Sequence, residues 1–129
     1  MLPSFLLPDT LARKDGQGED VALEESPLTP LLITLEINRI LEQESLNVSV
    51  LGSSDGRTWN RLGAFPAKSY CGQYSLVLDL AQHRDVRALR VDWSMSRWTT
   101  RWNPGERELA CGFRVLAEEA AAHAVAGAA

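Results

Sequence analysis

The stretch LNVSVLGSSDGRTWNRL, residues 46–62, decides how the chain is expected to fold. In its first half apolar and polar residues alternate, which is the period-two pattern of a strand with one buried face; the apolar set is Leu46, Val48 and Val50. The next residues, GSSDG, are of types that take a positive φ angle or bond their own backbone, so a turn is predicted. The chain then returns through TWNRL, and we expect the Trp59 ring to fold over this hairpin.

Other segments repeat the alternation and are interpreted as strands, at 21–24, 70–80, 88–95 and 109–116. LLITLEINRI, residues 31–40, has a competing helical interpretation over 35–44, but its β-branched residues and strict alternation favour a strand. Residues 63–69 are expected to form a loop or an irregular edge. The predicted inward side chains are Ile33, Leu35, Ile37, Tyr74, Leu76, Leu78, Leu80, Leu89, Val91, Trp93, Cys111, Phe113 and Val115.

Short strands separated by turns, with no long amphipathic helix between them, predict an all-β fold, an antiparallel β-sandwich. We expect the sandwich domain to span residues 21–116. Residues 1–20 are interpreted as an N-terminal extension that packs on this domain, and residues 117–129 as an alanine-rich tail, helical or disordered.

Composition narrows the function classes. The chain has 129 residues, enough for one domain with its own core, and a net charge of −4, which argues against a nucleic-acid footprint. The charge is uneven: residues 1–50 carry three basic and nine acidic side chains, residues 51–129 ten and eight. An anionic or sugar-like partner is therefore expected on the second half.

No segment has the length of a membrane span or the pattern of a signal peptide, so a cytoplasmic location is expected, or an extracellular one if the chain is part of a longer protein.

The hairpin also carries a family resemblance. GSSDGRTW, residues 52–59, is similar to the S-x-D-G-x-x-W signature of discoidin-like domains (coagulation factor 5/8 C-type), and the segments 79–91 and 112–115 resemble later strands of that family. The resemblance covers about residues 31–116. It implies a jelly roll of the galactose-binding-like superfamily that binds glycans, lipid headgroups or proteins through loops at one end. Two features depart from the family: Cys71 is central rather than near a domain end, and no calcium loop can be aligned.

The loop SRWTTRWN, residues 96–103, is the candidate ligand site. Sugar recognition combines a flat aromatic platform with planar groups that donate several hydrogen bonds, and this loop supplies both. The predicted ligand-binding residues are Arg97, Trp98, Arg101, Trp102 and Asn103. The alternative is that the two tryptophans, at i and i+4, cap the end of the sandwich while the arginines remain solvated.

The sequence contains few candidate catalytic residues. His83 lies in a polar turn, His123 lies in the tail, and no histidine or cysteine cluster has metal-ligand spacing. Asp55 precedes glycine, as the turn requires, so a structural role is favoured over cation binding. Two cysteines do not make a disulfide framework, although one bridge between Cys71 and Cys111 stays open. We therefore expect no enzyme activity, no metal and no cofactor.

Two functions are consistent with these features. The first is a non-catalytic binding module that recognises a carbohydrate or similar polar ligand. The second is a structural or protein-interaction domain in which the same loop, together with an apolar patch formed by Phe5, Leu6 and Leu7, covers a protein partner or a second copy in a homo-oligomer. Neither function involves nucleic acid or a membrane span.

Overall fold

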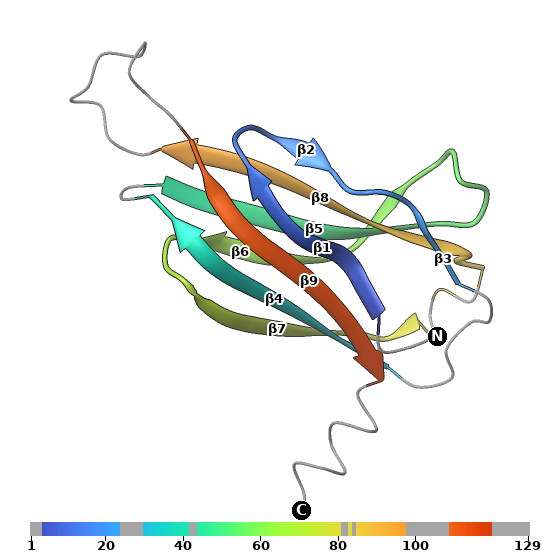
Figure 1. Cartoon of the computed structure of the whole chain (residues 1–129). Helices are drawn as coiled ribbons and strands as arrows, with labels where there is room; N and C mark the ends of the chain where they lie inside the picture. The colour runs from blue at the N-terminus through green and yellow to red at the C-terminus, as the bar shows by residue number, and fades with distance from the viewer. Residues whose placement is uncertain are drawn as a thin grey trace, which may run out of the picture.

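A computed structural model describes residues 4–23, 30–41, 44–80, 83, 85–97 and 109–119, and these form two antiparallel sheets packed face to face (Figure 1). The four-stranded sheet has the order β1 (Ser4–Ala12), β9 (Cys111–Glu119), β4 (Leu31–Ile40) and β7 (Gly72–Leu78). The second sheet has the order β2 (Gly16–Gln17), β8 (Ala88–Arg97), β5 (Glu44–Ser53) and β6 (Asn60–Lys68), and β3 (Val21–Ala22) also pairs with β8. The predicted all-β antiparallel sandwich is confirmed.

The core lies between the sheets and includes most of the residues that the alternation predicted to face inward, although Tyr74, Leu76 and Trp93 are only half-buried. The fully buried side chains include Leu46, Val48 and Val50 on β5, Ile33 and Leu35 on β4, and Cys111, Phe113 and Val115 on β9. On β7 burial alternates from Tyr74 to Leu78 as predicted, although the strand is shorter than the predicted 70–80. The helical alternative for 35–44 is wrong, because residues 31–40 pair along their length with β9 and β7.

The hairpin between β5 and β6 turns through a network around two side chains. The Asp55 Oδ1 atom accepts hydrogen bonds from the backbone N–H groups of Arg57 and Thr58, each at 2.8 Å, and from the Ser53 hydroxyl at 3.0 Å. The Ser53 Oγ atom in turn accepts from the N–H of Gly56 at 2.8 Å. Gly56 has φ of 77°, a conformation that glycine adopts without steric cost. Asp55 therefore has the structural role that the sequence favoured.

Residues 1–20 require a correction. Residues 4–12 are not an extension outside the sandwich: β1 pairs with β9 and forms an edge of the four-stranded sheet. Leu6 and Leu7 are buried in the core, so of the expected apolar patch only Phe5 is exposed. Pro8 lacks a backbone donor, which an edge strand tolerates because one side of it needs no partner. The closing strand likewise continues beyond residue 116, to Glu119.

Residues 63–69 are expected to form a loop or an irregular edge, and the structure shows an edge strand over most of this range. β6 includes both Gly63 and Pro66 and pairs with β5 through two register shifts. Gly63 faces the core, where an added Cβ atom would approach Leu78 Cδ2 to 2.7 Å. A larger residue here would force the Leu78 side chain to shift, so glycine fits best. A glycine in place of an apolar residue interrupts the period-two pattern by which the strand could have been predicted.

Both cysteines are free thiols, with Cys71 exposed and Cys111 buried. Burial, with smaller contributions from the charges of Glu44 and Cys71, raises the pKa of Cys111 to about 12. The Cys111 thiol is consequently protonated at neutral pH and behaves as a small core residue.

Replacing Phe113 tests the packing of the two sheets. Phe113 is fully buried on β9, and its ring meets that of Trp93 on β8 edge to face, with centroids 5.5 Å apart. We expect Phe113→Ala to lower the free energy of unfolding by about 3–5 kcal/mol, measured by urea denaturation. Phe5→Ala, at a 47% exposed position, is the matched control and should cost about 1 kcal/mol or less. Equal costs for the two variants would contradict the assigned core.

The turn should make stability depend on pH through Asp55. Hydrogen bonds from the Thr58 and Arg57 backbone and from the Ser53 hydroxyl hold the pKa of Asp55 below its usual value. Ionised Asp55 therefore stabilises the fold above the unfolded-state pKa of about 3.9, and this stabilisation is lost as the pH falls through the lower folded-state pKa. Asp55→Asn should be less stable than the wild type near neutral pH, with the difference shrinking in acid. Exposed Asp20 provides the control substitution, Asp20→Asn; a difference for Asp55→Asn that stays constant with pH would refute the prediction.

Candidate binding site

The outer face of the five-stranded sheet carries polar side chains, whereas its inner face is apolar. The same alternation that buries Val48 turns Asn47 and Ser49 outward on β5, and it turns Asp92 and Ser94 outward on β8. The register places Asn47 opposite Ser94 and Ser49 opposite Asp92. Four polar side chains from two strands therefore lie together on one surface.

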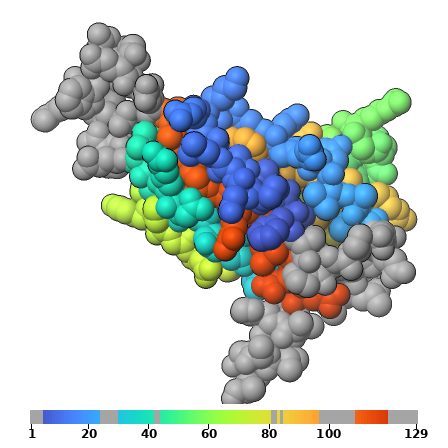
Figure 2. All heavy atoms as spheres, in the orientation of Figure 1, coloured from blue at the N-terminus to red at the C-terminus, as the bar shows by residue number. Residues whose placement is uncertain are grey.

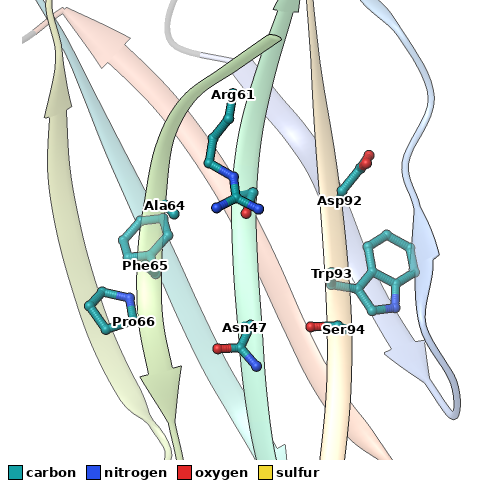
Figure 3. Close-up of a pocket in the computed structure, with 9 residues that line it drawn as sticks. Asn47, Arg61, Ala64, Phe65, Pro66, Asp92, Trp93 and Ser94 are labelled. Carbon is teal, nitrogen blue, oxygen red and sulfur yellow. The ribbon is translucent and has the colours of Figure 1, made fainter. Parts of the chain in front are cut away.

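This surface is hollowed, and β6 closes one side of it. We use the name outer-face hollow for a depression of about 480 Å³ lined by Asn47, Ser49, Arg61, Ala64, Phe65, Pro66, Asp92, Trp93 and Ser94. Figure 3 shows Arg61 extending over β5, between Asp92 on one side and the β6 wall on the other. The exposed surfaces of Ala64 and Pro66 make that wall apolar.

Most polar groups of the outer-face hollow are free to bind a ligand. In the described part of the chain, Asn47, Ser49, Arg61 and Ser94 make no side-chain hydrogen bond or ion pair with the protein. Asp92 is held in place: its two carboxylate oxygens accept hydrogen bonds from Arg90 Nε at 2.8 Å and Nη2 at 3.1 Å. Each oxygen of a carboxylate can accept a second hydrogen bond, so Asp92 retains acceptor capacity.

Two tryptophans support the outer-face hollow from its margins. Trp59, from the hairpin, is half-buried with the Arg90 guanidinium 4.5 Å from its ring centroid, and it therefore holds the arginine that orients Asp92. Trp93 donates its indole N–H to the Lys14 carbonyl at 2.9 Å and packs on Phe113. Trp59 is therefore a half-buried packing residue of the hairpin.

The sequence-predicted site falls mostly outside the described residues. Arg97 is the last residue of β8, and its side chain is not described; Trp98, Arg101, Trp102 and Asn103 lie outside the described ranges. The strand that carries Asp92 and Ser94 thus leads directly into the predicted loop. Beside Arg97, Ser96 shares a hydrogen bond of 2.7 Å with Ser45.

Sequence reasoning missed Arg61, Asp92, Ser94 and Asn47 as site residues. The sequence does indicate that each of these residues faces outward, because each occupies an outward position in the alternation of its predicted strand. The alternation alone does not show which outward residues of separate strands become neighbours. That information depends on the register between β5, β6 and β8.

Glu44 was also missed as a buried group. It begins β5 with no exposed surface and lies two positions before Leu46, so both side chains are on the inner face of the strand. Its Oε2 atom accepts a hydrogen bond from the Ala110 backbone N–H at 2.8 Å, while Oε1 has no hydrogen-bond partner among the residues described. Glu44 therefore ties the beginning of β5 to the beginning of β9.

A second depression, of about 400 Å³, lies on the outer face of the four-stranded sheet. Three of its polar side chains are already paired with one another: Glu36 Oε2 accepts hydrogen bonds from Arg114 at 3.0 Å and from Gln73 at 3.1 Å. These bonds lower the pKa of Glu36, with Gln73 the largest contributor and then Arg114. With its main hydrogen-bonding groups used internally, this surface is a weaker candidate for ligand binding than the outer-face hollow.

No group of three or more histidine, cysteine, aspartate or glutamate side chains within the described ranges could hold a metal ion. His83 is exposed, as expected for a turn. Among the same residues no helix has the length and apolar character needed to cross a bilayer.

Comparison with known proteins adds no assignment. Neither the family models nor the curated proteins contain a match to the chain. The function is therefore argued from the site alone.

Removing the Trp59 ring should destabilise the protein to an intermediate extent. A fully buried tryptophan costs about 3–5 kcal/mol on truncation to alanine, so we expect about 2 kcal/mol for half-buried Trp59→Ala, measured by thermal or urea unfolding. Trp59→Phe retains a ring beneath Arg90 and should cost about 1 kcal/mol or less. A loss for Trp59→Ala as large as that for Phe113→Ala, or no loss at all, would be inconsistent with this placement.

Proposed function

We propose that the protein is a non-catalytic binding module that holds a hydroxyl-rich ligand, an oligosaccharide, in the outer-face hollow. The observation that supports the proposal most directly is the set of polar side chains there that have no partner within the described residues. They come from three neighbouring strands of one sheet, so the scaffold that positions them is rigid.

The chemistry of these groups favours a sugar over an anion. A sugar hydroxyl both donates and accepts, so its site needs donors and acceptors side by side. Arg61 supplies a planar set of donors, Asp92 supplies acceptors, and Asn47 supplies both. A phosphate would gain from Arg61 but would be repelled by the Asp92 carboxylate. The exposed surfaces of Ala64 and Pro66 supply apolar contact for the C–H faces of a pyranose ring.

The sequence-predicted loop is compatible with this proposal. It continues from β8 after Arg97, and its tryptophans and arginines are of the types that would extend a sugar site. The jelly-roll and discoidin-like assignment stays a prediction from the hairpin motif. The protein-interaction alternative loses part of its basis, since Leu6 and Leu7 belong to the core.

Glycan-array screening followed by calorimetry on the full chain tests the proposal. We expect the wild type to bind a subset of neutral oligosaccharides and Arg61→Ala to weaken binding at least tenfold, because hydrogen bonds to a charged group contribute about 1.5–3 kcal/mol. Asn47→Ala should weaken binding less. Arg39→Ala, which removes an exposed arginine from the other sheet, should have no effect.

Two results would overturn the proposal. One is a folded wild type that binds no glycan on the array. The other is a glycan whose affinity is unchanged by Arg61→Ala and Asn47→Ala but lost on Trp98→Ala, which would move the site to the loop.

A further inference from the structure

In the described part of the chain, three sheet edges carry features that block pairing with another strand. β1 contains Pro8 and has two register shifts against β9. β6 contains Pro66 and has two register shifts against β5. At the remaining edge of the five-stranded sheet, β2 and β3 have only two residues each. Prolines, bulges and very short strands are the usual means by which proteins prevent sheets from joining edge to edge.

β7 has none of these features. Its sequence, GQYSLVL, contains no proline and no charged residue, and it pairs with β4 at every position from Gly72 to Leu78 without a register shift. β7 is the last strand of its sheet, so alternate backbone N–H and C=O groups point away from β4. Figures 1 and 2 show it along the lower rim of the molecule.

We propose that β7 is a dimer interface, at which β7 of a second copy pairs antiparallel with it about a two-fold axis. The two four-stranded sheets then become one continuous sheet. A register centred on Ser75 places Tyr74 opposite Leu76 of the partner subunit on the inner face, and Gln73 opposite Val77 of the partner subunit on the outer face. Each of these pairs occurs twice, as a two-fold axis requires.

Charge favours a second copy at this edge. The chain carries a net charge of −4, so two copies repel one another over most orientations. β7 itself has no charged side chain, although the Lys68 Nζ atom of β6 lies 4.5 Å from the Tyr74 ring centroid. The Glu36 carboxylate, opposite Gln73 on β4, is paired with Arg114 at 3.0 Å. Antiparallel pairing of β7 with itself therefore brings no like charges into opposition along the strand.

Partly covered side chains also fit this arrangement. Tyr74 and Leu76 face the core but are only half-buried, and β7 is the last strand of its sheet among the described residues. Val77 is 60% exposed on the outer face. Pairing would cover all three, each against a side chain of the partner.

The size of the contact determines the affinity that we expect between the two copies. Seven residues at about 3.4 Å each give a strip about 24 Å long. One strand edge covers much less than the roughly 800 Å² per partner of a standard stable interface, so we expect a reversible dimer in the micromolar range or weaker.

Sedimentation equilibrium of the full chain over a wide concentration range tests the interface. The wild-type mass should rise with concentration from 14.2 kDa toward twice that value. Ser75→Lys places two like charges opposite one another at the two-fold axis and should raise the dissociation constant at least tenfold. Gln17→Lys adds the same charge to an exposed position on β2, at an edge of the other sheet, and should leave the dissociation constant unchanged. A wild type that stays at the monomer mass, or a dimer unaffected by Ser75→Lys, overturns the proposal.

Hydrogen exchange on the wild type provides a test that does not depend on a variant folding. Amides of β7 should exchange more slowly at high protein concentration than at low concentration, while amides of the β6 edge should not change. A dimer that forms without added protection in β7 places the interface elsewhere and rejects this assignment.

Discussion

The structure depends on the burial of the inner face of β5 in one sheet and the inner face of β9 in the other. Val48 and Val50 on β5 and Phe113 and Val115 on β9 have no exposed surface, and each strand lies inside its sheet with a neighbour on both sides. Burying such side chains contributes about 1.5–3 kcal/mol each, which exceeds the effect of any surface contact in the molecule. Because side chains alternate along a strand, this burial also determines which residues face the solvent.

The candidate site is a consequence of that constraint. Once Val48 faces inward, Asn47 and Ser49 must face outward, and pairing with β8 brings Ser94 and Asp92 beside them. The network of Ser53 and Asp55 closes the hairpin and brings Trp59 beneath Arg90. The turn thus contributes to the site indirectly, because Arg90 holds the carboxylate of Asp92.

The period-two pattern predicted the fold well where strands have one buried and one wet face. It placed β4 at its observed bounds and identified the core positions of β5 and β9. It failed at strands with unusual backbone requirements: β6 contains Gly63, which must approach Leu78 closely, and β1 contains Pro8 at an open edge. The predicted all-β sandwich was unaffected by these failures, because both strands lie at sheet edges.

The candidate site could be predicted only in part. The sequence indicated a polar ligand and a binding role, but it directed attention to a loop of tryptophans and arginines. The outer-face hollow depends on the register between three strands, and the bulges of β6 set which residue, Arg61, lies opposite Leu51. Those shifts arise from glycine, proline and core packing together, so no short pattern encodes them. Glu44 is buried although it lies in a polar segment, which favours an exposed position. Its place two residues before Leu46 puts its side chain on the inner face of β5.

The contact of Trp93 with Phe113 tests the facing of the two sheets most directly, because these rings belong to β8 and β9 in different layers. Nuclear Overhauser effects between their ring protons, measured by solution NMR, report on that contact. With the centroids 5.5 Å apart, the account predicts strong cross-peaks between the two rings and none from Phe113 to the Asn47 side-chain amide. Cross-peaks from Phe113 to Asn47, with none to Trp93, would show that β5 presents its other face to the core and would contradict the account.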